Sequence, residues 1–210
     1  MKRCRCSLVI TLSGLTVCFG DAAAADVPVQ AASLRPASAF SNIDDQHARS
    51  VAFFTEAAKV IQHPRCLNCH PVTRQPTQGD DLHPHVPLMY AGPGDHGVAG
   101  LPCKSCHGTV NVETPGSRIA SIPGNPRWGL APSSMAWQGK AAREICLQIK
   151  DRTRNGGRSL ADIHRHLATD PLVGWAWHPG AGREPAPGTQ AEFGALIAAW
   201  VSTGAHCPEP

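Results

Sequence analysis

The sequence is poor in aromatic side chains, in long apolar runs and in net charge. Aromatic residues make up 5% of the 210 residues, with a single tyrosine. After residue 25, no apolar stretch approaches the roughly 20 residues that a membrane-spanning helix needs. The formal net charge of +3 is too small to indicate a nucleic-acid partner. These features argue against stable membrane insertion and against nucleic-acid binding.

The sequence is rich in glycine, proline, cysteine and histidine. Its 20 glycines and 19 prolines interrupt helices and long strands. With so few aromatic side chains, such a chain needs disulfides, metals, oligomerisation or a large cofactor to complete its core. The nine cysteines and 11 histidines are the residues that can meet this need.

The N-terminus has the three parts of a secretory signal peptide. Basic residues at positions 2, 3 and 5 precede an apolar stretch over 8–19, and the alanines at 23–25 form a small-residue cleavage site. The apolar stretch, of about 12 residues, is too short to cross a bilayer. We expect residues 1–25 to be a signal peptide cleaved near Ala25, and the mature chain to be periplasmic. An uncleaved anchor is the alternative.

The cysteines divide into three groups. Removal of the signal takes away Cys4, Cys6 and Cys18. Four of the remaining six belong to a repeated motif: Cys66, Cys69, Cys103 and Cys106. The other two, Cys146 and Cys207, are in an oxidising compartment, so we expect them to form a disulfide. Two separate thiols are the alternative.

Apolar residues recur at helical spacing in four segments. We expect helices over 44–62, 139–150, 159–168 and 190–203. Ser159 and Thr189 are N-cap residues for the last two. Residues 26–43 read as a flexible leader, and 71–100 and 108–136 as loops without a convincing strand. We therefore predict an all-α fold with long loops.

A Cys-x-x-Cys-His motif occurs twice, at 66–70 and 103–107. This motif is the attachment signal of c-type haem. Its two thiols lie on one face of a helical turn and match two vinyl groups of the porphyrin, and the next histidine ligates the iron. We expect two covalent haems, one held by Cys66, Cys69 and His70 and the other by Cys103, Cys106 and His107.

Two other interpretations of the paired cysteines are open. A zinc ribbon also uses two Cys-x-x-Cys knuckles, but the segment between Cys69 and Cys103 is long for a compact ribbon. Zinc also does not account for a histidine after both knuckles. A thioredoxin-like dithiol pair would need a βαβ pattern, which the sequence does not show. Export favours haem, because c-type haems are attached outside the cytoplasm.

Five further stretches carry a resemblance to a known family: His83–His85, Gly100–Cys103, Leu130–Trp137, Arg154–Arg158 and Trp175–Gly180. With the two motifs, they make residues 45–208 resemble periplasmic dihaem c-type cytochromes of a group labelled isoquinoline 1-oxidoreductase subunit. The resemblance implies one dihaem, cytochrome c-like domain over 44–208. It also implies a molybdenum hydroxylase as the electron donor.

The sixth ligand of each iron decides between electron transfer and substrate chemistry. We predict Met135 as the distal ligand of the second haem, because a methionine in a loop of Pro, Gly and Ser has little core to fill. For the first haem we predict His85, with Met89 as the alternative. A His/Met iron has the higher potential, so electrons would flow from the first haem to the second.

Other conspicuous residues receive structural interpretations. We expect His63 in a loop, His96 in a turn, and His164 and His166 on the solvated face of their helix. One basic stretch either ends a solvated helix or pairs with haem propionates or an acidic partner: Lys150, Arg152, Arg154 and Arg158. Five tryptophans are expected to pack against the porphyrins: Trp128, Trp137, Trp175, Trp177 and Trp200.

The favoured function is a periplasmic electron-transfer cytochrome without a substrate of its own. No nucleophile–base pair, paired carboxylates or phosphate-binding loop stands out. The alternative is a haem enzyme with one open iron site, similar to a dihaem peroxidase, although such enzymes are normally longer and have two similar halves. A haem-based sensor would need an output segment. The expected partner is another periplasmic redox protein, met through a small transient surface.

Overall fold

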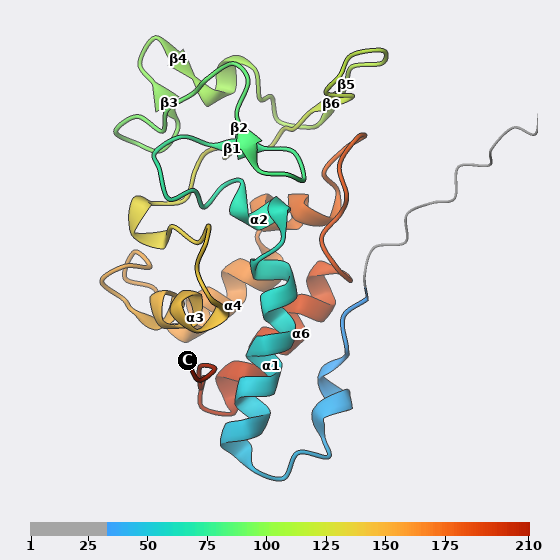
Figure 1. The fold of residues 1–210 in the computed structure, drawn as a ribbon, viewed down its shortest axis with the longest axis vertical. Helices are drawn as coiled ribbons and strands as arrows, with labels where there is room; N and C mark the ends of the chain where they lie inside the picture. Colours follow the sequence, from blue (N-terminus) through green and yellow to red (C-terminus); the bar gives the residue numbers. More distant parts are fainter. Residues whose placement is uncertain (1–32) are drawn as a thin grey trace, which may run out of the picture.

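The computed structural model describes residues 33–210. The predicted signal peptide at 1–25 and the leader as far as residue 32 lie outside the described residues. Figure 1 shows two layers, one of packed helices and one of loops with short strands. The two expected haem-attachment motifs lie in the loop layer and at its boundary with the helices.

Helices of the described chain include all four that the sequence predicts. Six α-helices and four 3₁₀ turns make about 39% of residues 33–210 helical. The α-helices are α1 (Gln46–Ile61), α2 (Pro64–Leu67), α3 (Ala142–Lys150), α4 (Leu160–Thr169), α5 (Pro171–Gly174) and α6 (Gln190–Ser202). The 3₁₀ turns are η1 (Ala37–Phe40), η2 (Cys103–Ser105), η3 (Ser133–Met135) and η4 (Trp175–Trp177).

Local hydrogen bonds set the helix ends. Asp45 is the N-cap of α1 and accepts a hydrogen bond from the Ala48 backbone N–H at 2.7 Å, so the helix begins two residues later than the sequence suggests. Ser159 caps α4 and forms a capping box with Asp162. Thr189 caps α6 by accepting from the Glu192 N–H. The short helices α2 and α5 each begin with a proline, which suits the first helical position.

The expectation of an all-α fold is wrong, because the described chain also contains small antiparallel sheets. Six two-residue strands pair as three hairpins, β1 (Thr77–Gln78) with β2 (His83–Pro84), β3 (Gly97–Val98) with β4 (Leu101–Pro102), and β5 (Val112–Glu113) with β6 (Ser121–Ile122). The register pairs are Thr77 with Pro84, Gly97 with Pro102, and Val112 with Ile122. Strands of this length contain too few residues for apolar and polar positions to alternate visibly.

The apolar core lies between the helices. Phe54 of α1 packs against Trp200 of α6, with ring centroids 5.0 Å apart. Gly194 allows α6 to approach α4 closely, since a Cβ at this position would come within 2.6 Å of the Ala168 Cβ. Within residues 33–210, none of the buried residues of the core cluster lies between positions 62 and 134. The loop layer therefore adds little to this core.

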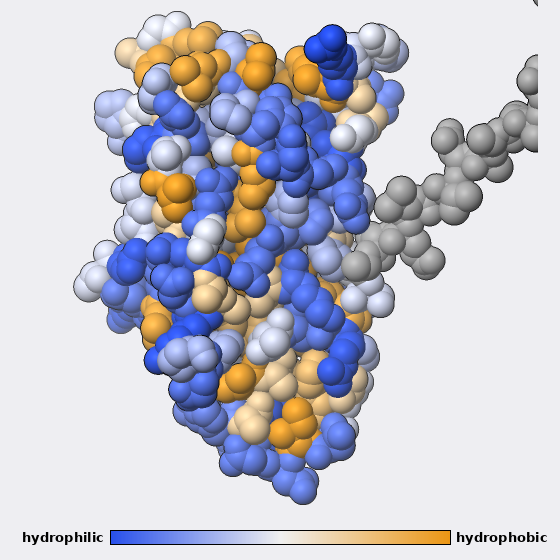
Figure 2. Space-filling view, in the orientation of Figure 1, coloured by the Kyte–Doolittle hydropathy of each residue, from blue (hydrophilic) through white to orange (hydrophobic). Residues whose placement is uncertain are grey.

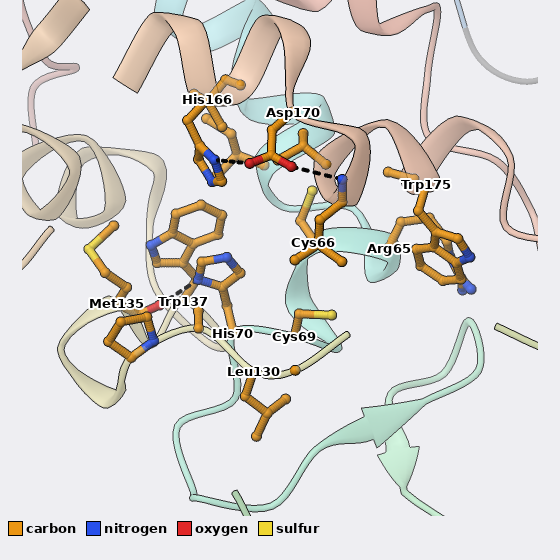
Figure 3. Close-up of a pocket in the computed structure, with 18 of the residues that line it drawn as sticks. Arg65, Cys66, Cys69, His70, Leu130, Met135, Trp137, His166, Asp170 and Trp175 are labelled. Carbon is orange, nitrogen blue, oxygen red and sulfur yellow. Dashed lines mark hydrogen bonds and ion pairs between the residues drawn. The ribbon is translucent and has the colours of Figure 1, made fainter. Parts of the chain in front are cut away.

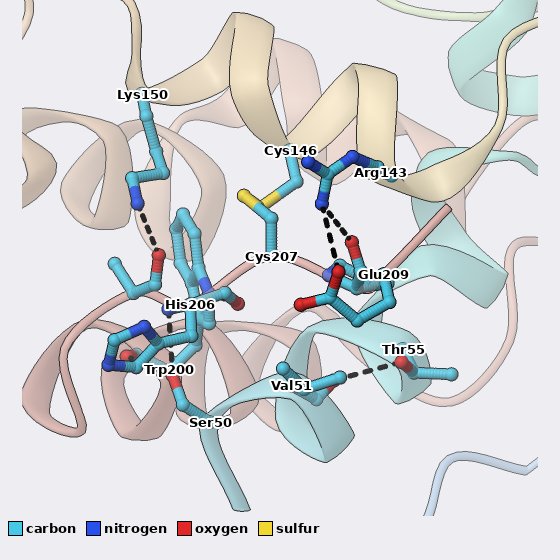
Figure 4. The surroundings of a disulfide bond; sticks show 12 residues. Ser50, Val51, Thr55, Arg143, Cys146, Lys150, Trp200, His206, Cys207 and Glu209 are labelled. Carbon is cyan, nitrogen blue, oxygen red and sulfur yellow. Dashed lines mark hydrogen bonds and ion pairs between the residues drawn. A yellow bond between two sulfur atoms is a disulfide. The ribbon is translucent and has the colours of Figure 1, made fainter. Parts of the chain in front are cut away.

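The predicted disulfide between Cys146 and Cys207 is confirmed. It joins α3 to the segment after α6, with a Cα–Cα distance of 5.7 Å (Figure 4). Lys150 donates to the Ala205 carbonyl at 2.7 Å and Arg143 to the Pro208 carbonyl at 2.8 Å on either side of the bond. The C-terminal segment is thereby fastened along α3.

Apolar side chains are exposed mainly at the hairpin end. Within residues 33–210, no helix combines the length and the hydropathy needed to cross a membrane. Figure 2 shows hydrophobic groups along the end of the molecule formed by the hairpins. Most of the large exposed apolar residues lie there: Val86, Leu88, Tyr90, Val98, Leu101, Val110, Val112 and Ile119.

Candidate functional site

Two neighbouring cavities each contain one of the repeated motifs. Their volumes are about 290 Å³ and 250 Å³. Cys66, Cys69 and His70 line the first cavity, and Cys103, Cys106 and His107 line the second. Six residues line both cavities and form a shared wall: Arg65, Cys69, Trp128, Gly129, Leu130 and Trp175.

The first motif follows α1 at a sharp change of direction. His63 caps α2 by accepting from the Arg65 N–H, and this single helical turn places Cys66 and Cys69 on the cavity wall (Figure 3). The imidazole of His70 donates from Nδ1 to the Met135 carbonyl at 2.6 Å. It also stacks on Trp137, with centroids 3.5 Å apart and planes within 5°.

The second motif repeats this local arrangement without a preceding long helix. The imidazole of His107 donates from Nδ1 to the Pro123 carbonyl at 2.8 Å. It stacks on Trp128, with centroids 4.8 Å apart and an interplanar angle of 18°. A carbonyl can only accept, so the proton in both motifs is on Nδ1 and the lone pair on Nε2 is available for a metal.

Burial disfavours the charged forms of the three first-motif side chains and of His107 in the second motif. It lowers the pKa of His70 to about 4 and lowers the pKa of His107. Burial raises the pKa of the Cys66 thiol to about 12 and that of Cys69 to about 11. The first motif therefore offers neutral thiols and a neutral imidazole, and His107 is a neutral imidazole in the second. A neutral imidazole is the form that ligates iron.

The predicted distal ligands line the opposite cavities from those that the sequence analysis expected. Met135 lines the first cavity and is absent from the residues lining the second, while His85 and Met89 line the second. The pairing of Met135 with the second haem, and of His85 or Met89 with the first, therefore does not match the structure. The physical reason is chain folding, because η3 returns to the first motif through the Trp137 N–H bond to the His70 carbonyl at 2.9 Å.

Met135 contacts His70 through its backbone, at the nitrogen that carries the proton. Its carbonyl binds Nδ1, which is on the side of the imidazole away from Nε2. In the second cavity, by contrast, His85 lies 5.9 Å from His107 between ring centroids. The Nδ1 of His85 is bonded to the Pro87 carbonyl at 2.8 Å, which leaves its Nε2 available.

Sequence reasoning missed a histidine in the first cavity. His166 was expected on the solvated face of its helix, but it is half-buried and lines the cavity. Its Nδ1 is 3.0 Å from Oδ2 of Asp170 (Figure 3). The signal was its position at helical spacing beside Ile163 and Leu167, which are both buried. His96, expected in a turn, also lines this cavity and contacts the Trp128 carbonyl at 3.1 Å.

A buried cation lies in the wall between the cavities. Arg65 is 2% exposed, donates to the Gly79 carbonyl at 3.1 Å and pairs with Asp80. Its Nε has no hydrogen-bond partner among the described residues. Arg183 lines the second cavity and donates to Ser121. A buried guanidinium with a free N–H is suited to a carboxylate ligand.

The basic stretch at 150–158 is largely occupied with the backbone. Arg152 donates to the Gly157 carbonyl and Arg154 to the Ser134 carbonyl. Arg158 is the member of this stretch that lines the first cavity. Three of the tryptophans line a cavity: Trp128, Trp137 and Trp175. Trp177 and Trp200 line neither cavity and belong to the core cluster.

The zinc alternative needs the cysteines of both motifs to lie together as ligands of one metal ion. Within 33–210, no group of three or more His, Cys, Asp and Glu side chains is arranged to hold a metal ion. The four motif cysteines are free thiols.

Comparison with family models, with curated proteins and with solved structures gives no match. The functional argument therefore rests on the motifs and the cavities that contain them.

Proposed function

We propose that the protein is a dihaem c-type cytochrome that transfers electrons in the periplasm. The observation that carries this proposal is the repeated motif geometry. Each Cys-x-x-Cys-His motif lies in a cavity of its own, and each histidine is held through Nδ1 by a backbone carbonyl. This is the outer-shell arrangement that orients an imidazole for metal binding.

The residues around the motifs also fit the proposed cofactor. Cys66 and Cys69, and likewise Cys103 and Cys106, would form thioether bonds as each S–H adds across a porphyrin vinyl group. Arg65 would donate from its free Nε–H to a propionate carboxylate. When bound, the haem iron supplies a one-electron redox centre. The chain would hold the group and supply its ligands.

The shared wall supports electron transfer between two centres. Six residues line both cavities, so groups held in them would be separated by a single layer of side chains. Both cavities also contain histidines beyond the motifs, His166 in the first and His85 in the second. A chain-derived ligand at the distal position favours an electron carrier over an enzyme with an open iron. The peroxidase-like alternative needs one distal position to be free.

Mass spectrometry tests the proposal directly. Protein exported with the haem-attachment machinery should be heavier than the chain by two haems, and acid–acetone should not extract them. The Cys103→Ala/Cys106→Ala variant should carry one haem, on the first motif. A wild-type mass equal to the bare polypeptide, or to one haem, would contradict the proposal.

The proposed partner is a periplasmic redox protein, with a molybdenum hydroxylase as the donor that the sequence resemblance suggests. The apolar hairpin end lies beside the second cavity, since Val86, Leu101 and Ile119 belong to both. Leu88 is 57% exposed and lines neither cavity. It therefore tests docking without altering the site.

Stopped-flow reduction by a purified hydroxylase measures this encounter. Leu88→Glu should slow bimolecular reduction, because a charge is placed in an apolar contact. Leu147→Glu is the matched control, since Leu147 is 47% exposed on α3. Equal rates for both variants would exclude docking at the hairpin end, and failure of the hydroxylase to reduce the wild type would exclude this donor.

A further inference from the structure

We propose that His166 is the distal iron ligand in the first cavity and that Asp170 is the residue that positions it. The inference rests on the proposed function, because it assumes a haem held by Cys66, Cys69 and His70. His166 extends from α4 into the cavity, whereas His70 enters from the loop after α2 (Figure 3). The cavity therefore receives an imidazole from each of two separate elements.

The hydrogen bond of His166 leaves its Nε2 free to bind a metal. Its Nδ1 is 3.0 Å from Oδ2 of Asp170. An ionised carboxylate only accepts, so Nδ1 carries the proton and the Nε2 lone pair can coordinate iron. A carboxylate on the remote nitrogen also makes the imidazole a stronger donor to a metal.

Asp170 is itself held in place on its other side. Its Oδ1 accepts from the Leu172 N–H at 2.8 Å as the N-cap of α5, and it pairs with Arg127. The Asp170 N–H donates to the His166 carbonyl at 3.2 Å, so both residues belong to the same turn. This network fixes the rotamer of His166 before any ligand binds.

The other candidates in the first cavity are less suitable. Met135 places its carbonyl on Nδ1 of His70, on the side of the ring away from Nε2. His96 is exposed, lies in a loop, and has a backbone carbonyl in place of a carboxylate as its partner. His166 combines a helical backbone with a charged partner, and both features reduce the entropy lost when it coordinates.

The test uses the haem-loaded protein and reads the ferric spin state by electron paramagnetic resonance. His166→Ala should convert one of the two low-spin haems to high spin, and the reduced protein should gain one carbon monoxide site per chain. His164→Ala, on the same helix, is the matched control, because His164 lines neither cavity. Met135→Leu retains the carbonyl that holds His70 and should leave both spectra unchanged.

A second variant guards against loss of folding. His166→Met offers a thioether from the same position, and it should give one haem the charge-transfer band of a methionine–iron bond. Asp170→Asn keeps an oxygen for the α5 cap and should raise the midpoint potential of the same haem, because the imidazole becomes a weaker donor.

Haem content by mass spectrometry, read together with the spin state, separates failure of the His166 assignment from failure of the proposed function. If His166→Ala carries both haems and remains low-spin at both, or if Met135→Leu turns one haem high-spin, the His166 assignment is overturned. If the wild-type chain carries no haem, the proposed function itself is overturned.

Discussion

At the scale of single residues, every histidine that lines a cavity has an oxygen at its Nδ1. The five are His70, His96 and His166 in the first cavity and His85 and His107 in the second. The oxygens are carbonyls in four cases and a carboxylate in the fifth. All five therefore favour the tautomer that leaves Nε2 free. The cavities thus offer more imidazole ligands than the two motifs contain.

The buried histidines should make the haem-free chain sensitive to mild acid. Burial lowers the pKa of His70 to about 4, and it also lowers the pKa of His107. The unfolded chain takes up a proton near pH 6.5 that the folded chain does not bind until lower pH. The free energy of unfolding should therefore fall as the pH falls through this window, by up to about 3 kcal/mol for His70 alone. Urea unfolding of the chain produced without haem attachment, between pH 7 and about pH 4, measures the effect. A flat profile would contradict it.

The ion pair between Arg65 and Asp80 should show unequal costs on removal. The Arg65 side chain is 1% exposed, whereas that of Asp80 is 50% exposed. Asp80→Ala leaves a buried guanidinium unpaired and should destabilise the protein by about 1–3 kcal/mol. Arg65→Met combined with Asp80→Ala removes both charges, and Asn68 still donates to the Gly79 carbonyl at 2.9 Å. The double variant should therefore unfold at higher urea than Asp80→Ala, and the reverse order would exclude this account.

At the scale of elements, the disulfide holds the C-terminal segment against the helical layer. Cys146 and Cys207 are 61 residues apart, and closing a loop of this length contributes about 4 kcal/mol in the chain-entropy model. The Cys146→Ala/Cys207→Ala variant should lose about this much, with faster hydrogen exchange in the segment after α6. Reduced wild-type protein is the control and should behave similarly. An unchanged urea midpoint would show that the remaining bonds to α3 suffice.

At the scale of the whole molecule, the two layers differ in what holds them together. The helical layer contains the core cluster. The loop layer has few buried apolar residues, with Met89 and Ala91 the two described between positions 71 and 130. The three hairpins of the loop layer contribute two residue pairs each. Such a layer has few stabilising contacts of its own, and the proposed second haem would supply further ones.

Loss of the proposed second haem should therefore loosen the loop layer and leave the helical layer intact. The Cys103→Ala/Cys106→Ala variant should be cleaved by trypsin first within 71–130, where Arg74, Lys104 and Arg118 are available. Its far-ultraviolet circular dichroism should remain close to that of the wild type, because α1 and α6 lie in the other layer. First cleavage inside α1 or α6 would show that the layers fold as one unit.

Local features were predictable because neighbouring residues determine them. The four long helices follow from apolar spacing and from caps such as Asp45 and Ser159. The Cys146–Cys207 bond follows from cysteine counting and the expected compartment. The hairpins were not predictable, since two-residue strands leave no periodic pattern. His166 was missed because its helical spacing with Ile163 indicates the inward side of α4 but does not show that a cavity lies there.

The sequence alone determined the two Cys-x-x-Cys-His motifs on which the haem proposal rests, since their pattern involves residues three and four positions apart. It could not determine which distant side chain faces which motif. Met135 reaches His70 and not His107 because the loop over 123–137 returns to the first motif through backbone hydrogen bonds from Ala131 and Trp137. Only the tertiary structure decided this pairing, because the free energy of such a return is spread over contacts between segments far apart in the chain.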